Sequence, residues 1–183
     1  MRIGITGTIG SGKSEVTNYL RSKGFEVFNC DETNAIILEN RSFELLSNDF
    51  SDCFENRMLN KKRLADVIFS DSKRRKKLES ILHPIILNEL LAINNELVFA
   101  EVPLLYEVGW DKYFDEVVLV VSDESIALKR LEARGVDYNE SKKRILSQLP
   151  VEEKIKKATF IIYNNGSLDE LHSSIDKYLE SIC

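Results

Sequence analysis

The segment that most constrains this chain lies near its start, at residues 7–14. It has the sequence Gly-Thr-Ile-Gly-Ser-Gly-Lys-Ser and fits the pattern G-x-x-x-x-G-K-S/T. Residues 2–6 before it have the composition of a buried strand, and residues 13–23 have the pattern of a helix. A strand, a glycine-rich turn and a helix in this order point several backbone N–H groups at one phosphate group. We therefore predict a nucleotide phosphate site; a glycine-rich turn that binds nothing is the alternative.

The residue types in this segment suit the binding of ATP and Mg²⁺. Lys13 can reach the β- and γ-phosphates, and the hydroxyl of Ser14 can coordinate Mg²⁺. Glu15 follows in the first turn of the helix, where an acidic side chain is compatible with the helix dipole. The residues predicted to bind the nucleotide are Gly7, Thr8, Ile9, Gly10, Ser11, Gly12, Lys13, Ser14 and Glu15.

Five short apolar runs rich in β-branched or aromatic residues predict the strands of one sheet. They are residues 2–6, 25–29, 97–102, 116–121 and 159–163. Helical patterns separate most of them, which is typical of a parallel sheet with crossover helices. One such helix is expected at 124–134, with Gly135 ending it. The fold class predicted is α/β.

The long stretch between the second and third strands has little strand character. Helix-like spacing at 38–54 and 64–82 predicts a helical insertion at about 36–95 instead. It could cover a second substrate or simply pack against the sheet. Thr33 is a candidate N-cap for a short helix, and Pro84 is expected at the first position of another helix.

Composition excludes several classes of protein. With 43% hydrophobic and 30% charged residues, the 183-residue chain is typical of one soluble globular domain. No apolar run approaches the roughly 20 residues of a membrane helix, and a signal-peptide pattern is absent. The net charge of −5 argues against a nucleic-acid partner. Three widely spaced cysteines indicate a reducing environment without disulfides or a zinc site. We expect a cytoplasmic monomer with at most weak self-association.

Acidic side chains follow two of the predicted strands. Asp31 comes after the second strand, and at this edge of a parallel sheet it could accept a proton from an attacking hydroxyl or help to hold Mg²⁺; a turn or helix-cap role is the alternative. Glu101 ends the third strand and is a candidate Mg²⁺ partner. Glu107 is a weaker candidate, because it could simply face water.

Basic residues cluster late in the chain and in the insertion. Arg130 and Arg134 are spaced four apart and share one helix face, from which guanidinium groups could close over ATP; a solvated charged face is the alternative. The basic runs 61–63 and 73–77 must mostly face solvent. His83 precedes a proline, and a lone histidine is more often structural than catalytic.

Four segments, in this order, resemble those of the dephospho-coenzyme A (dephospho-CoA) kinase family. Residues 5–14 resemble its phosphate loop, 27–31 (Val-Phe-Asn-Cys-Asp) occupy the place of its D-x-D motif, 82–85 (Leu-His-Pro-Ile) resemble its L-H-P motif and 102–107 (Val-Pro-Leu-Leu-Tyr-Glu) its P-L-L-x-E segment. Gln148 and residues 163–167 add a weaker match. The likeness runs through nearly the whole chain.

The resemblance implies a P-loop kinase fold in a single domain: a five-stranded parallel sheet flanked by helices, with its core at about 1–35 and 96–183. It also implies a helical coenzyme-binding insertion and a lid at about 130–150. The implied activity is ATP-dependent phosphorylation of the ribose 3′-hydroxyl of dephospho-CoA, the last step of coenzyme A synthesis.

Residue roles carried over by position follow from the same resemblance. Asp31 would be the base that faces the 3′-hydroxyl. His83 and Glu107 would lie on the coenzyme side, and Arg130 and Arg134 would serve the lid. Lys13 would act on the transferred phosphate.

The chain departs from the family pattern at two notable positions. Asn29 stands where the first aspartate of D-x-D is usual, and Thr159 stands where an aspartate is frequent. Two other functions stay open. One is a nucleoside or nucleoside-monophosphate kinase on the same scaffold, since the acceptor site rather than the fold decides the substrate. The other is a nucleotide-operated switch, although a guanine-reading N-K-x-D motif is absent.

Overall fold

The computed structural model describes residues 1–182 and divides the chain into two compact units. The first unit contains residues 1–29 and the chain from residue 95 onward, and the second contains Cys30–Asn94. The second unit therefore begins a few residues before the insertion predicted at about 36–95. We describe each unit by itself.

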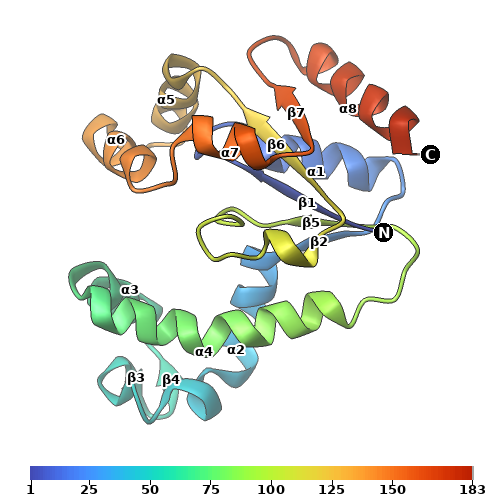
Figure 1. Ribbon diagram of the computed structural model, residues 1–183. Coiled ribbons are helices and arrows are strands. Elements are labelled where there is room, and N and C mark those ends of the chain that lie inside the picture. The colour runs from blue at the N-terminus through green and yellow to red at the C-terminus, as the bar shows by residue number, and fades with distance from the viewer. Residues whose placement is uncertain (183) are drawn as a thin grey trace. The chain divides into compact units, whose positions relative to one another are not determined.

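The first unit is built on a five-stranded, fully parallel sheet (Figure 1). Its strands are β1 (Arg2–Gly7), β2 (Val27–Asn29), β5 (Val98–Glu101), β6 (Glu116–Val121) and β7 (Phe160–Tyr163), in the order β2-β5-β1-β6-β7. All five predicted strands are confirmed, with ends shifted by up to two residues. Because β1 is central and its neighbours are parallel, the carboxyl ends of β1, β2 and β5 meet at one edge, where ligands bind in open α/β sheets.

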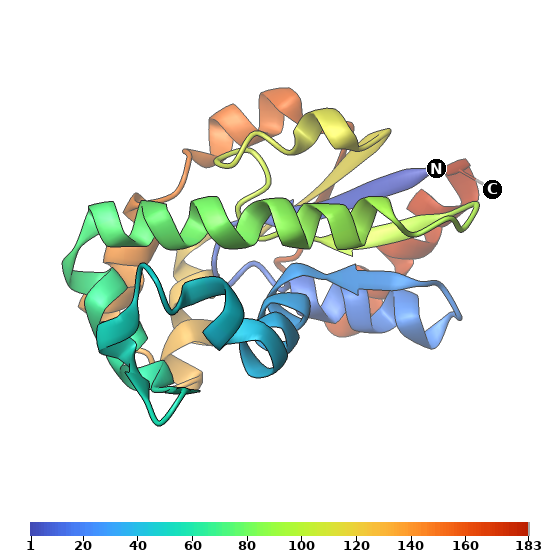
Figure 2. The same ribbon diagram turned by 90° about the horizontal axis from the view of Figure 1, so that it is seen from below.

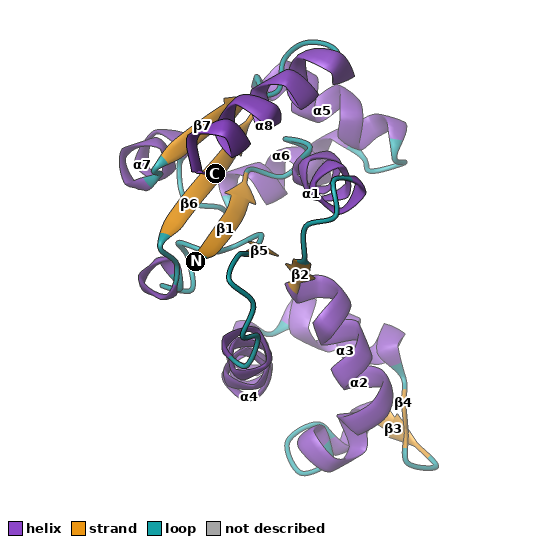
Figure 3. Ribbon diagram, turned by 90° about the vertical axis from the view of Figure 1, so that its right-hand side faces the viewer, coloured by secondary structure: helices purple, strands orange, loops and turns teal. Residues whose placement is uncertain are grey.

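Helices cover both faces of this sheet (Figure 3). The helices of the unit are α1 (Lys13–Ser22), α5 (Glu124–Ala133), α6 (Tyr138–Leu146), α7 (Val151–Lys157) and α8 (Leu168–Ile182), with a 3₁₀ turn, η2, at Asp111–Tyr113. α1 and α8 pack on one face, over a core that includes Ile5, Phe99 and Val118. α7 contacts β6 on the other face, where the segment after β5 lies so close to β1 that a Cβ at Gly4 would be 2.6 Å from Leu105 Cδ1. Close packing on both faces explains why the strands are nearly all apolar.

The prediction for α5 is confirmed to within one residue, since the helix ends at Ala133 rather than at Arg134. Asp123 is its N-cap residue, and Arg134 is its C-cap. Gly135 follows with φ +79°, the left-handed conformation that commonly terminates a helix.

The second unit is helical, as predicted, but its internal boundaries differ. Its elements are α2 (Cys30–Leu46), the 3₁₀ turn η1 (Ser51–Cys53), β3 (Phe54–Glu55), β4 (Met58–Leu59), α3 (Lys61–Ser70) and α4 (Ser72–Leu91). Thr33 lies inside α2 and is not an N-cap. The helix expected at 64–82 is split at Asp71, whose carboxylate accepts hydrogen bonds from the N–H groups of Lys73 and Arg74 and caps α4.

The helix-like spacing at 38–54 was also misleading at its C-terminal end. α2 stops at Leu46, and Phe54 pairs with Leu59 in the small antiparallel hairpin β3–β4. The two residues between the strands, Asn56 and Arg57, have φ of 50° and 65°. Two consecutive positive φ values define the tight turn whose twist matches a hairpin.

Pro84 does not start a helix, contrary to the prediction. It lies inside α4, a single continuous helix that Figure 2 shows in green. An interior proline costs about 3 kcal/mol. The buried residues Leu78, Leu82, Ile86 and Leu90 form one face on both sides of it, and each such side chain contributes roughly 1.5–3 kcal/mol on burial. Burial along the whole face therefore outweighs the local cost. Among residues 1–182, none of the helices is both long and apolar enough to cross a membrane.

Candidate active site

The phosphate loop joins β1 to α1 at the carboxyl edge of the sheet. Gly10 and Gly12 have φ of 77° and 94°, and Gly12 is the N-cap residue of α1. A Cβ at Gly12 would lie 2.2 Å from Nδ2 of Asn164. Glycine is therefore required at residue 12 both by the backbone conformation and by the close approach of a neighbouring side chain.

The ammonium group of Lys13 lies over this loop. It donates hydrogen bonds to the carbonyl oxygens of Gly7 (3.2 Å) and Thr8 (3.1 Å). These bonds hold a positive charge beside the N-terminus of α1, where the helix dipole also favours an anion. The loop thus has the charge and the converging donors that a phosphate chain needs.

A buried carboxylate faces the first turn of α1. Glu101, at the end of β5, is 5% exposed. It accepts hydrogen bonds from the hydroxyls of Ser14 (3.3 Å) and Thr17 (2.8 Å) and from the amide of Asn29 (3.1 Å). Three donors from two elements therefore orient one carboxylate toward the hydroxyl expected to bind Mg²⁺.

These groups fit a Mg²⁺ site of the kind that nucleotides complete. Hydroxyl and carboxylate oxygens are the ligands that Mg²⁺ prefers, and the ion usually takes only one or two protein ligands besides water and phosphate oxygens. Within the described residues there is no group of three His, Cys, Asp or Glu side chains that could hold a metal without such help. The metal role of Ser14 and Glu101 stays a prediction.

Arg130 extends from α5 to the phosphate loop. Its guanidinium donates to the carbonyl oxygens of Ser11 (3.4 Å) and Asn164 (3.1 Å) and to Oδ1 of Asn164 (3.3 Å). Asn164, buried at the end of β7, in turn donates from Nδ2 to the carbonyl of Ser11 at 2.8 Å. The loop is thereby braced by two residues distant in sequence.

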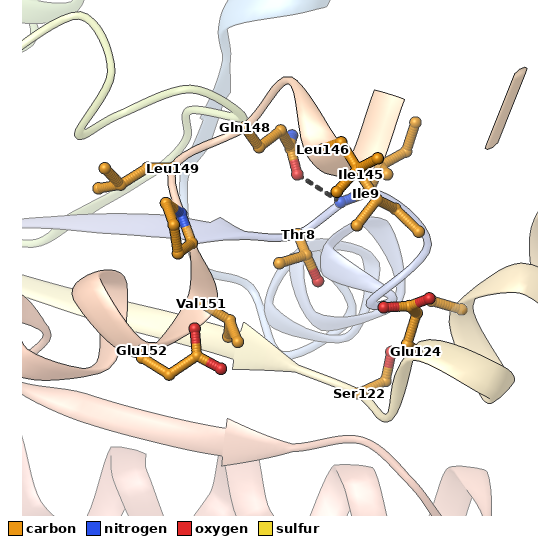
Figure 4. Close-up of a pocket in the computed structure, with 12 residues that line it drawn as sticks. Thr8, Ile9, Ser122, Glu124, Ile145, Leu146, Gln148, Leu149, Val151 and Glu152 are labelled. Atoms are coloured by element: carbon orange, nitrogen blue, oxygen red, sulfur yellow. Dashed lines mark hydrogen bonds between the residues drawn. The ribbon is translucent and has the colours of Figure 1, made fainter. Parts of the chain in front are cut away.

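Arg130 and Arg134 line one cavity of about 390 Å³ beside the loop. Gly12, Glu15 and Asn164 also line it. The shared helix face expected for the two arginines thus turns toward the predicted nucleotide site. Thr8 and Ile9 line a second cavity, of about 300 Å³, together with residues at the end of α6. Figure 4 shows the side chains that line it.

Glu107 lies in the segment after β5, at the end of the P-L-L-x-E-like block. Its Oε1 accepts a hydrogen bond from the N–H of Leu149 (3.0 Å) and lies 2.8 Å from the ammonium of Lys154. Gln148, beside Leu149, accepts a bond from the N–H of Ile9 at 3.0 Å (Figure 4). The substrate-side role of Glu107 stays a prediction.

The remaining predicted residues lie in the second unit. Asp31 is the second residue of α2 and is exposed. His83 is half-buried within α4, where burial lowers its pKa and Glu79 has a smaller opposing effect. The roles of Asp31 as base and of His83 on the coenzyme side stay predictions.

Part of the basic sequence in the second unit is paired locally. Arg74 forms a two-pronged ion pair with Asp52, at 2.6 and 2.7 Å, and its hydrogen bonds hold the pKa of that carboxyl down at about 2. Lys77 lies 3.3 Å from Asp49.

Comparison with known proteins matches the full chain. A family model described as dephospho-CoA kinase matches residues 1–170. The chain belongs to the dephospho-CoA kinase family. Dephospho-CoA kinases of Fusobacterium nucleatum and Thermus thermophilus are 35% and 38% identical to it, over 100% and 98% of this chain and 98% and 91% of their own.

Solved structures agree with membership of the dephospho-CoA kinase family. A crystal structure of a Thermus thermophilus protein has a TM-score of 0.88 at 37% identity, covering 100% of this chain and 98% of its own. Dephospho-CoA kinase from Campylobacter jejuni has a TM-score of 0.74 at 27% identity, over 99% and 96% of the two chains. Shikimate kinase from Acinetobacter baumannii, at 18% identity and a TM-score of 0.59, shares the fold. The predicted P-loop kinase fold is confirmed.

Sequence reasoning missed two residues near the candidate site of this dephospho-CoA kinase family member. Thr17 lies three residues after Ser14, on the same helix face, so helical spacing was a usable signal. Lys154 sits among several lysines and glutamates, and nothing in that pattern marks it as fully buried.

Proposed function

We propose that this protein transfers the γ-phosphoryl group of ATP to the ribose 3′-hydroxyl of dephospho-CoA, which gives coenzyme A and ADP and completes coenzyme A synthesis. The observation that supports this most is a complete phosphate loop, with Lys13, Ser14 and Glu101 gathered at one sheet edge, in a chain that matches dephospho-CoA kinases along its whole length.

The phosphate loop and Lys13 would bind the phosphate chain of ATP. Loop amides and the Lys13 ammonium stabilise the negative charge that develops on the transferred group. Arg130 would approach the same charge from α5, and the cavity that it lines with Arg134 would take the nucleoside portion. Ser14 and Glu101 would hold Mg²⁺, which neutralises charge on the β- and γ-phosphate oxygens.

Asp31 would act as the general base. The 3′-hydroxyl oxygen bonds to the γ-phosphorus while the bond from that phosphorus to the bridging oxygen breaks, and ADP leaves with the electron pair. The hydroxyl proton passes to the Asp31 carboxylate. The position of Asp31, two residues after the end of β2, and its match to the second aspartate of D-x-D support this role.

The acceptor would be recognised largely by the second unit. His83 would lie on the coenzyme side with the helical insertion, and Glu107 with the segment after β5. Residues 130–150, which contain the end of α5 and all of α6, would form the lid. We propose a cytoplasmic monomer. Among residues 1–182, the buried cysteines Cys30 and Cys53 form no disulfide bond, which is compatible with a reducing compartment.

The decisive experiment is a comparison of acceptors. Purified protein is incubated with Mg²⁺ and ATP labelled at the γ-phosphate, together with dephospho-CoA or a panel of nucleosides and nucleoside monophosphates. We expect label in coenzyme A, identified by its mass. Preferential labelling of a nucleoside or monophosphate would instead favour that second kinase class, and tight ATP binding without transfer to any acceptor would favour a switch.

A further inference from the structure

We propose that Glu107 and Lys154 anchor the C-terminal end of the predicted lid, and that Gln148 connects this anchored end to the phosphate loop. All three would be positioning residues that act through the loop. This inference rests on the proposed function, since it concerns the same transfer reaction.

Lys154 is a buried charge paired with Glu107. Its side chain, in α7, is 0% exposed, and its ammonium lies 2.8 Å from Oε1 of Glu107, whose side chain is 20% exposed. The geometry is that of an ion pair rather than of an aligned hydrogen bond. A buried ammonium without its partner is strongly destabilising, so this pair ties α7 to the segment after β5.

The same pair is linked to the predicted lid. The Oε1 atom of Glu107 that faces Lys154 also accepts the N–H of Leu149, at 3.0 Å. Leu149 lies in the short connection between α6 and α7, where the predicted lid ends. The carboxylate of Glu107 therefore holds the backbone at Leu149, and the buried ammonium of Lys154 sets the position of that carboxylate.

Gln148 connects this segment to the phosphate loop. Gln148, next to Leu149, accepts the N–H of Ile9 through its Oε1 at 3.0 Å, a contact between residues 139 apart in sequence (Figure 4). Ile9 lies at the middle of the loop. This bond restrains the loop at Ile9 and Gln148, which line one cavity, whereas Arg130 lines another.

The anchor would leave α6 free to move. Leu146, the last residue of α6, is 82% exposed and lines the cavity beside Thr8 and Ile9. An exposed ion pair between Lys142 and Glu124 joins α6 to α5, and such pairs contribute little. If the lid rotates about residues 147–150, α6 would move while Gln148 stays hydrogen-bonded to Ile9 of the loop.

The test removes the anchor in two independent ways. Lys154→Met with Glu107→Gln replaces the buried charge pair by neutral side chains of similar size, which commonly preserves folding. Gln148→Ala cuts the link to Ile9 without touching the pair. The matched control is Lys156→Met with Glu153→Gln, which removes an exposed ion pair of 2.6 Å from the same helix.

We expect both anchor variants to keep a melting temperature near that of the parent. Their kcat with dephospho-CoA should fall about tenfold, the effect of one hydrogen bond of typical strength, while KM for ATP changes by less than about threefold. Hydrogen exchange over residues 7–14 should become faster in both variants and remain unchanged in the control.

Two results would overturn the proposal. One is parental kcat and parental exchange in Gln148→Ala, and the other is a folded double variant with parental values of both. If the parent protein does not phosphorylate dephospho-CoA, the proposed function fails instead, and hydrogen exchange still decides whether the anchor restrains the loop.

Discussion

The hydroxyl of Ser14 lies 3.3 Å from Oε1 of Glu101, although 87 residues separate them in sequence. The register of the sheet explains the meeting, because Ile5 of β1 is paired with Glu101 of β5, and the loop that follows β1 leads directly into Ser14. The same carboxylate also accepts from Thr17 and Asn29. A single acidic side chain is thus held by three donors at the predicted metal position.

Replacing Glu101 by Gln should weaken the use of Mg²⁺. The substitution keeps the shape of the side chain but removes the negative charge, and loss of such a partner typically lowers metal affinity by roughly 10- to 100-fold. We expect the Mg²⁺ concentration that gives half-maximal rate to rise accordingly. Glu132→Gln, on the exposed surface of α5, is the control. An unchanged Mg²⁺ dependence would remove Glu101 from the metal site.

Replacing Asp31 by Asn should abolish most turnover while leaving ATP binding intact. A well-placed general base contributes about 10²- to 10⁴-fold in rate, and kcat should fall within that range. Calorimetric titration with MgATP should give the parental affinity. Glu32→Gln tests the neighbouring carboxylate, which we expect to be dispensable. Near-normal turnover in Asp31→Asn would contradict its role as the base.

Replacing Arg130 by Lys should raise KM for ATP. The planar guanidinium reaches both the carbonyl of Ser11 and Asn164, and a lysine cannot reproduce that fork. Hydrogen bonds of charged groups contribute about 1.5–3 kcal/mol, so we expect an increase of roughly 10- to 100-fold. Lys129→Ala, at the adjacent exposed position of α5, is the control. Equal values of KM in both variants would argue against a nucleotide role.

Replacing Tyr106 by Phe should leave stability unchanged or increase it. The side chain is 7% exposed, and within residues 1–182 its hydroxyl has no hydrogen-bond partner. A buried hydroxyl without a partner costs about 1–3 kcal/mol, part of which the substitution recovers. The aromatic ring that faces the ammonium of Lys157 is retained. Thermal unfolding measures the change, and a marked loss of stability would show that the hydroxyl is needed.

Tyr106 should also lose its proton at a higher pH than an exposed tyrosine does. Burial raises the pKa of Tyr106 to about 12, and burial together with the hydrogen bond to Glu116 raises the pKa of Tyr178. Above pH 10 or so the unfolded chain releases these protons before the folded one does. Stability should therefore fall as the pH rises from about 10 to about 12. Tyrosinate absorbance should show a step near pH 12 that Tyr106→Phe lacks; an identical titration in both proteins would contradict the assignment.

Prediction succeeded where the signal was local. The strands β1 and β6 consist mostly of buried apolar residues, and the end of α5 is set by Gly135, whose conformation few other residues adopt. It failed at Pro84 and at the hairpin around Asn56. Burial along α4 outweighed the local preference of Pro84. The helix-like spacing at 38–54 continued past Leu46, where α2 ends, to Phe54, which pairs with Leu59 in the hairpin.

Residue order by itself determined the strand–loop–helix unit at 2–22, the parallel class of the sheet and the family of the chain, because each depends on neighbouring residues or on motifs in sequence. Only the tertiary structure brought Glu101 to Ser14, Asn164 to Ser11 and Lys154 to Glu107. These contacts join segments up to 153 residues apart. They depend on strand order and on which side chains lose contact with water, and a linear pattern carries neither.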